Sequence, residues 1–294
     1  MRLKLRDRVI ELEPGRPRLM GIVNATPDSF SDRQGPKDLG ELLEHAHRLV
    51  ADGAEIVDVG GESGRTDRPA VGEDEEAERI APVVERLTSS GIAVSVDTWR
   101  PGPARAALDA GAAMVNDVSA LADPALAGLC ADYGAALVVT HTRTAPKTKG
   151  FASYDDVVAD VLALLRARMA VALERGVDAD ALLLDPGVDL AKTPAESVEL
   201  LRRLGELEQL GRPLLMAVSR KDFVGALTGR APGARDAGTL AALEPALDLP
   251  GAVARVHDVA GAADFLAVRA ALRGDAQTPD GALAAELRRE ASVR

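Results

Sequence analysis

Short apolar runs in this 294-residue chain each end in side chains that could do chemistry. These residues are Asn24, Asp97, Asn116, Asp185, Lys221, Arg255 and His257. Turn chemistry explains Asn and Asp at the ends of strands, but it does not explain Lys, Arg and His gathered at the last ones. We therefore interpret these residues as parts of one site rather than as separate turns.

Asp97, Asn116 and Asp185 suit a flat heterocycle that carries hydrogen-bond donors along one edge. Carboxylates accept from ring N–H and NH₂ groups, and an amide both donates and accepts. A 2-amino-4-oxo pyrimidine ring has such an edge, and Lys221 would donate to a ring nitrogen or oxo group. The alternative is that Asp97 and Asp185 are only ion-pair partners at the rim of a barrel.

The remaining charged candidates are cationic and suit phosphate. Arg65 and Arg255 can each bind phosphate through two N–H groups, and His257 can add a donor. Arg255 and His257 are two residues apart, which places them on one face of a strand. Asn24 could offer its carbonyl oxygen to a phosphate-bridging Mg²⁺, which takes oxygen ligands. The alternative for Arg255 is a ring of alternating charges inside a barrel.

Eight apolar runs alternate with longer helical patterns, and each run is too continuously apolar for a strand with one wet face. The predicted strands are 18–24, 55–60, 93–97, 113–118, 136–141, 181–185, 213–219 and 252–257. The predicted helices are 38–52, 73–89, 101–110, 123–133, 153–175, 194–204, 235–247 and 259–272. Ser153 is the expected N-cap of the fifth helix.

This repeat predicts an α/β fold, a (β/α)₈ TIM barrel, as one domain over residues 1–294. A short N-terminal β-hairpin around Leu3–Leu12 would close its bottom. A doubly wound sheet is the alternative, although no G-x-G-x-x-G follows the first strand. The tail after about residue 274 is polar and is expected to be loosely attached. In a barrel all strand ends share one face, so the candidate residues would meet there.

The composition of the chain disfavours some classes of binding partner. The formal charge of −11 argues against a nucleic-acid or membrane-surface binder, and no apolar run reaches membrane length. The single cysteine excludes an internal disulfide, and the N-terminus lacks the apolar segment of a signal peptide. The chain has four histidines and one cysteine, and these residues form no evident zinc site. We expect a cytoplasmic protein that acts on small molecules.

Several blocks of the sequence resemble the dihydropteroate synthases in order and spacing, over about residues 3–273. The blocks are MGIVNATPDSFSD, DVGGES, VSVDT, VNDVSAL, LLLDPG, SRK followed by FVG, and RVHDV. The resemblance implies a barrel enzyme, usually a homodimer, that is a target of sulfonamides. Such an enzyme joins 6-hydroxymethyl-7,8-dihydropterin diphosphate to p-aminobenzoate, with Mg²⁺, and releases diphosphate in folate synthesis.

The resemblance also implies a role for each candidate. The pterin would be held by Asp97, Asn116, Asp185 and Lys221, of which Asp97, Asp185 and Lys221 are the implied catalytic residues. The diphosphate would be held by Asn24, Arg65, Arg255 and His257, with Asn24 reaching it through the metal ion. The acceptor pocket would include Phe30, Gly64, Thr66 and Asp222. Diphosphate would leave early, and carboxylates would stabilise the pterin cation that the aryl amine attacks.

The acceptor side departs from the family pattern. Gly64 and Thr66 stand where the family usually has Thr and Pro, and the usual GFGKT reads Asp189 to Thr193. Asp222 stands where a Ser would offer its hydroxyl to the aminobenzoate carboxylate. A carboxylate there would repel that group by about 1 kcal/mol or more at close range. This altered pocket also predicts lower sensitivity to sulfonamides.

Two alternatives to the synthase stay open at the level of sequence. One is a paralogue with another acceptor for the same pterin diphosphate, or a pterin-dependent methyltransferase. The other is a pterin-binding module without turnover. The cationic residues after the strands argue against methyl transfer, because a methyl donor carries no diphosphate.

Overall fold

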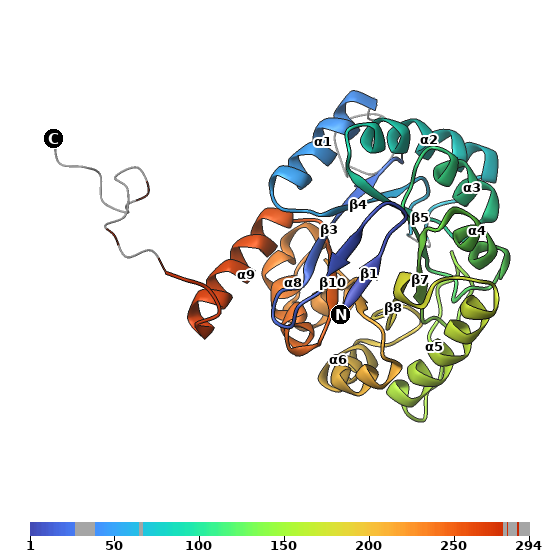
Figure 1. The fold of residues 1–294 in the computed structure, drawn as a ribbon. Helices are drawn as coiled ribbons and strands as arrows, with labels where there is room; N and C mark the ends of the chain where they lie inside the picture. Colours follow the sequence, from blue (N-terminus) through green and yellow to red (C-terminus); the bar gives the residue numbers. More distant parts are fainter. Residues whose placement is uncertain (27–38, 65–66, 279–280, 282–286, 288–294) are drawn as a thin grey trace.

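Eight parallel strands close into a barrel in the order β10-β3-β4-β5-β6-β7-β8-β9, and helices surround it (Figure 1). This computed structural model describes residues 1–26, 39–64, 67–278, 281 and 287. The barrel strands are β3 (Arg18–Asn24), β4 (Ile56–Gly60), β5 (Ala93–Asp97), β6 (Met114–Asp117), β7 (Ala136–Thr140), β8 (Leu182–Asp185), β9 (Leu214–Met216) and β10 (Ala252–Val256). The predicted TIM barrel is confirmed.

The described helices follow the strands in the expected alternation. They are α1 (Leu39–Ala51), α2 (Glu73–Ser89), α3 (Pro101–Asp109), α4 (Ala125–Tyr133), α5 (Val157–Glu174), α6 (Pro194–Arg202), α7 (Asp222–Thr228), α8 (Asp236–Leu243) and α9 (Val259–Arg273). Short 3₁₀ turns lie at η1 (Ala179–Ala181), η2 (Leu204–Leu210), η3 (Pro232–Ala234) and η4 (Glu244–Asp248). Among these described helices, none has the length and apolarity that crossing a membrane requires.

Three details of the elements differ from the prediction. The cap of α5 is Asp156, not Ser153: the Asp156 side chain accepts hydrogen bonds from the N–H groups of Val158 and Ala159. The strand expected at 213–219 has only the three residues of β9. A separate short helix, α7, follows it and was not expected from the periodicity.

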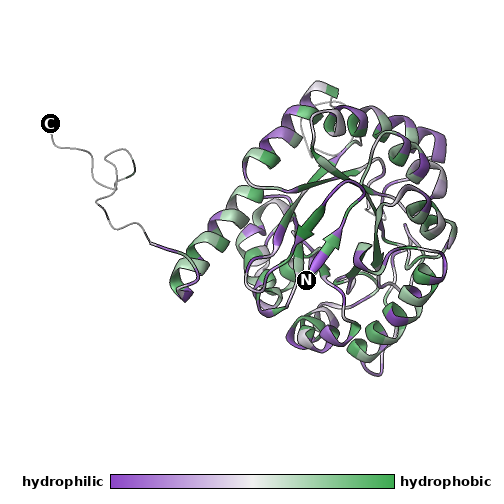
Figure 2. Ribbon diagram, in the orientation of Figure 1, coloured by the Kyte–Doolittle hydropathy of each residue, from purple (hydrophilic) through white to green (hydrophobic). Residues whose placement is uncertain are grey.

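The barrel is held by apolar burial on both faces of its strands. Every residue of β4, β6, β7, β8 and β9 is buried. Figure 2 shows apolar residues along the strands and mixed surfaces on the helices. Helix α1 buries Leu42, Ala46 and Leu49, which are spaced four and three residues apart along one stripe. This packing is the rigid frame from which the loops project.

An antiparallel hairpin, β1 (Arg2–Lys4) and β2 (Val9–Glu11), confirms the predicted N-terminal element. Its Arg2 and Lys4 pair with Asp180 and Asp178, each at 2.7 Å between nitrogen and oxygen. These two carboxylates lie just before β8, so the hairpin covers the amino ends of the barrel strands. The carboxyl ends at the opposite face remain for the candidate site.

Candidate active site

The register of the barrel brings the predicted carboxylates and amide together. Asp97 lies opposite Gly60 of β4 on one side and opposite Asn116 of β6 on the other. Asp185 ends β8, opposite Thr140 of β7. All of these positions are at the carboxyl ends of their strands, where barrel enzymes carry their active sites.

Arg255 of β10 joins this group across the mouth of the barrel. Its Nε donates to Asp58 Oδ2 at 2.6 Å, and its second terminal nitrogen donates to Asp97 Oδ2 at 2.7 Å. Asn116 Nδ2 donates to the same Asp58 oxygen at 3.0 Å. A member of the predicted ring-binding set, Asp97, is therefore in direct contact with a member of the predicted phosphate-binding set, Arg255.

Asp58 was missed in the sequence, where it lies inside the apolar strand IVDVG. Its side chain is fully buried, and within the part of the chain that the structure describes Arg255 is the cation that pairs with it. The signal that could have found it is a lone carboxylate in a strand that is otherwise apolar, because a buried charge needs a partner. Asp58 sets the position of Arg255 and of Asn116 together.

Electrostatics at the strand ends favour a ligand with hydrogen-bond donors. Burial raises the pKa of Asp97; the neighbouring Asp58 acts in the same direction, and Arg255 opposes both. Burial also raises the pKa of Asp185, against the charge of Lys221 and the Gly187 N–H, which donates to Asp185 at 2.7 Å. Among the described residues Asn116 Oδ1 is buried without a hydrogen-bond partner, so it has an acceptor to offer.

Lys221 stands at the N-cap of α7, and four residues separate it from the end of the barrel strand β9. Its Nζ donates to the carbonyl oxygen of Val188 at 2.6 Å. This contact brings its ammonium to the loop that follows Asp185, so the two predicted pterin-binding groups lie on joined loops.

His257 lies two residues beyond Arg255, and Ser219 holds its imidazole. The Ser219 hydroxyl accepts from the backbone N–H of His257 at 3.2 Å and lies 2.8 Å from Nδ1. Burial, and next the nearby Arg255, lower the pKa of His257 to about 4, so the imidazole is neutral near pH 7. When the hydroxyl donates to Nδ1, the proton of the imidazole stays on Nε2, where it can be given to a phosphate oxygen.

The comparison with known proteins decides the family. Residues 20–257 match the sequence model of the family described as pterin binding enzyme. The chain is 39% identical to the dihydropteroate synthase of Bacillus subtilis, over 82% of this chain and 83% of that one. It is 43% identical to the enzyme of Mycobacterium leprae, over 85% and 91%. The chain belongs to the dihydropteroate synthases.

Solved structures agree with this assignment. Dihydropteroate synthase from Xanthomonas albilineans with 4-aminobenzoic acid is 42% identical, with a TM-score of 0.84, and the match covers 92% of this chain and 98% of that one. The structure of that enzyme in complex with 7,8-dihydropteroate has a TM-score of 0.82, at 42% identity, over 93% and 99% of the two chains. The resemblance stated from the sequence blocks is confirmed.

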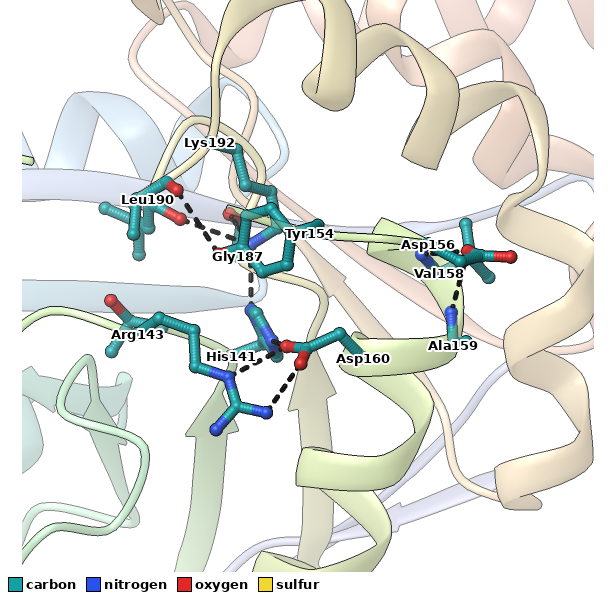
Figure 3. Close-up of polar contacts among 12 residues, drawn as sticks. His141, Arg143, Tyr154, Asp156, Val158, Ala159, Asp160, Gly187, Leu190 and Lys192 are labelled. Atoms are coloured by element: carbon teal, nitrogen blue, oxygen red, sulfur yellow. Dashed lines mark hydrogen bonds and ion pairs between the residues drawn. The ribbon is translucent and has the colours of Figure 1, made fainter. Parts of the chain in front are cut away.

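A buried ionic network lies beneath the loop that follows Asp185 in this dihydropteroate synthase (Figure 3). Lys192 Nζ contacts three acceptors: the carbonyl oxygens of Gly187 at 2.8 Å and Leu190 at 3.2 Å, and His141 Nδ1 at 2.8 Å. They match the three protons of an ammonium group. His141 Nε2 then donates to Asp160, at 2.8 Å. The base of the loop is thereby fixed to β7 and α5.

Desolvation shapes the protonation of this network. Burial lowers the pKa of Lys192 to about 7 and that of His141 to about 4. Arg143 binds Asp160 through two nitrogens, at 2.9 and 2.6 Å, and holds the pKa of that carboxyl below its usual value. The predicted strand 136–141 ends at His141, but the sequence gave no sign that Lys192 contacts it.

The acceptor-side residues are only partly described. Phe30, Thr66 and the diphosphate candidate Arg65 lie outside the described residues. Among the described residues, no atom lies within 4 Å of the Cβ that a side chain at Gly64 would add.

Asp222 has a cationic partner that the sequence did not reveal. Its side chain is 80% exposed, and Arg235 donates to its Oδ1 at 2.9 Å. Arg235 is 10% exposed and also donates to the carbonyl oxygens of Arg220 and Lys221. This ion pair offsets part of the negative charge of Asp222, which the sequence predicts would repel an aminobenzoate carboxylate.

The loop after β4 is anchored by a second ionic group that the sequence did not indicate. Glu62 accepts from the Val71 N–H at 2.9 Å and pairs with Arg100 at 2.9 Å. Arg100 also pairs with the buried Glu76 at 2.5 Å. These contacts fix both ends of the segment that contains Gly64.

Metal-binding groups do not cluster in the part of the chain that the structure describes. There, no three His, Cys, Asp or Glu side chains are placed to hold one ion. Asn24 ends β3 in register with Gly60, which in turn lies opposite Asp97.

Proposed function

We propose that this chain joins 6-hydroxymethyl-7,8-dihydropterin diphosphate to p-aminobenzoate, giving 7,8-dihydropteroate and diphosphate in folate biosynthesis. The observation that carries the proposal is the meeting of Asp97, Asn116 and Asp185 with Arg255 at the carboxyl ends of the barrel strands. Groups that suit a donor-edged ring then lie beside a cation that suits its leaving group. The relatives from Xanthomonas albilineans, solved with 4-aminobenzoic acid and with 7,8-dihydropteroate, support the choice of acceptor and product.

Asp185, Asn116, Asp97 and Lys221 hold the pterin ring in this proposal. Carboxylate oxygens accept from the ring N–H and amino groups, and the buried Asn116 Oδ1 gains the partner that it lacks among the described residues. Lys221 donates from the opposite side. Because these groups are ordered by the barrel before the ligand arrives, little conformational entropy is lost on binding.

Arg255 and His257 hold the diphosphate, with Arg65 as a further candidate. Ligand phosphate would draw the Arg255 guanidinium from its carboxylate partners, and the neutral His257 adds one N–H. Asn24 suits Mg²⁺ as a protein ligand, because this ion keeps several waters and takes phosphate oxygens. When bound, Mg²⁺ neutralises charge on the diphosphate as it departs.

The reaction then needs little acid or base catalysis from the protein. As the C–O bond to diphosphate breaks, positive charge spreads over the pterin, and Asp97 and Asp185 stabilise it. The neutral amine of p-aminobenzoate attacks the methylene carbon and afterwards loses a proton. On the acceptor side, Phe30, Gly64, Thr66 and Asp222 remain the proposed pocket.

Steady-state kinetics test this proposal. Purified chain, given both substrates and Mg²⁺, should form dihydropteroate and diphosphate in equal amounts. Asp185→Asn keeps the shape of the side chain but removes its charge, and we expect at least a tenfold loss in kcat/KM. Diphosphate release without dihydropteroate would indicate another acceptor. Pterin binding without turnover would indicate a binding module.

We also propose a cytoplasmic homodimer. A reduced single cysteine, Cys130, is consistent with the cytoplasm. Leu227 on α7 and Val268 and Leu272 on α9 are 60–83% exposed, and such apolar side chains are covered when copies associate. Sedimentation equilibrium should give twice the mass of the chain, and a monomer at micromolar concentration would contradict the assembly.

A further inference from the structure

Two consecutive residues of the loop between β8 and α6 hold Lys221 from two directions. The carbonyl oxygen of Val188 accepts from Lys221 Nζ at 2.6 Å. Asp189 Oδ2 accepts, also at 2.6 Å, from the N–H of Asp222, the peptide that follows Lys221. Lys221 makes no side-chain cap of its own on α7, so Asp189 satisfies an N–H that would otherwise lack a partner within its helix.

Asp189 is itself held in place. Its φ is +67°, a left-handed conformation that Asp adopts more readily than most side chains. Its N–H donates to the hydroxyl of the buried Ser197 on α6 at 3.1 Å. The same loop is fixed at its base by the Lys192 contact to Gly187 (Figure 3). The GFGKT block usual in the family has glycine at this position, so the carboxylate is a property of this chain.

Asp189 also adds negative charge beside the Lys221 ammonium. Burial lowers the pKa of Lys221, and the carboxylates that oppose this are, in order, Asp185, Asp189 and Asp97. The neighbouring cation Arg255 acts with burial to lower this pKa. Asp189 is the member of this group that contacts the Lys221–Asp222 backbone as well.

We propose that Asp189 is a positioning residue for Lys221, fixing its backbone through the Asp222 N–H and placing a carboxylate close to its ammonium. This role rests on the proposed function, in which Lys221 donates to the pterin ring. Asp189 acts through Lys221 and does not contact the ligand in this proposal. A glycine at this position would leave Lys221 with the Val188 contact alone from this loop.

Two substitutions separate the hydrogen bond from the charge. Asp189→Asn keeps a side-chain oxygen and tolerates the left-handed backbone, but it removes the charge. Asp189→Gly also tolerates the left-handed backbone, but it removes both the side-chain oxygen and the charge. Glu199→Gln is the matched control, because Glu199 is an exposed carboxylate on α6 that pairs with Arg203 at 3.6 Å. Calorimetry would measure binding of 6-hydroxymethyl-7,8-dihydropterin to the full chain from about pH 6.5 to 10.

At pH 7 we expect binding to be about tenfold weaker in Asp189→Gly and within about threefold of wild type in Asp189→Asn. In both variants the alkaline loss of affinity should move to lower pH by about half a unit or more, since Lys221 gives up its proton earlier. Ionisation of the ligand itself affects binding to wild type and to each variant equally, so it cancels in the comparison of their alkaline midpoints. Glu199→Gln should behave as wild type.

A purely structural role for Asp189 would weaken binding without moving the alkaline midpoint. A wild type that binds the pterin, with unchanged midpoints in both variants, therefore overturns the role of Asp189 alone. A wild type that does not bind the pterin overturns the proposed function, and this role with it.

Discussion

Arg255 links the charges of the site, since in the described part of the chain it is the direct cationic partner of both Asp58 and Asp97. Arg255→Ala would leave the fully buried Asp58 uncompensated, and breaking a buried pair in this way costs about 3–5 kcal/mol. We expect a loss of that size in the free energy of unfolding, measured with urea.

The double variant Arg255→Ala/Asp58→Asn tests the cause of that loss. It removes the charge of Asp58 as well as that of Arg255, so no buried charge is left unpaired at this pair and part of the lost stability should return. A double variant no more stable than Arg255→Ala would show that Arg255 acts through packing rather than through charge.

His257 should make stability depend on pH. Its folded-state pKa, about 4, is below the ordinary 6.5, so the unfolded chain binds more protons between these values. Stability from this group is therefore fully present above about pH 6.5 and falls as the pH drops toward 4. Urea unfolding from about pH 7 to 5 should show a smaller loss for His257→Asn than for wild type. His141 and Asp97 titrate in both proteins, and equal slopes would contradict the assignment.

The sequence predicted the strand-end residues but not their partners. Asp97, Asn116 and Asp185 were predictable because each ends an apolar run, and parallel strands bring such ends to one face. Asp58 and Lys192 were not, because each depends on at least one partner far along the chain. The contact of Lys192 with His141, for example, joins residues 51 positions apart.

At the scale of elements, the cap of α5 gives a direct test. Asp156 accepts two backbone N–H groups at 2.8 and 3.0 Å, whereas Ser153, the cap expected from the sequence, is exposed and precedes the helix by four residues. Asp156→Ala should lower the free energy of unfolding by about 1 kcal/mol. Ser153→Ala is the matched control and should change it little; the reverse result would place the cap at Ser153.

Element boundaries were predictable wherever burial gave a strong pattern. The strand 93–97 and the helix 73–89 were predicted with the bounds that they have. Helix α7 was missed, since it has only seven residues and a cap that comes from another loop, at Asp189. Hydrophobic periodicity cannot be detected in so short a segment, and no local capping signal marks its start.

At the scale of the molecule, the N-terminal hairpin should stabilise the barrel without serving its chemistry. Leu3 is fully buried, and Val9 of the same hairpin is 52% exposed. Leu3→Ala should lower the free energy of unfolding by about 2–5 kcal/mol and leave KM for both substrates unchanged. Val9→Ala, the control, should cost far less. A rise in KM with unchanged stability would mean that the hairpin acts on the site.

The central claim is that one barrel mouth binds a pterin ring and a diphosphate through different residues. Calorimetry with 6-hydroxymethyl-7,8-dihydropterin and with its diphosphate tests this most directly, on wild type, Asp185→Asn and His257→Asn. Asp185→Asn should weaken both ligands by similar factors, about tenfold or more. His257→Asn should weaken the diphosphate alone. Equal losses for both ligands in His257→Asn, or full affinity in Asp185→Asn, would contradict the account.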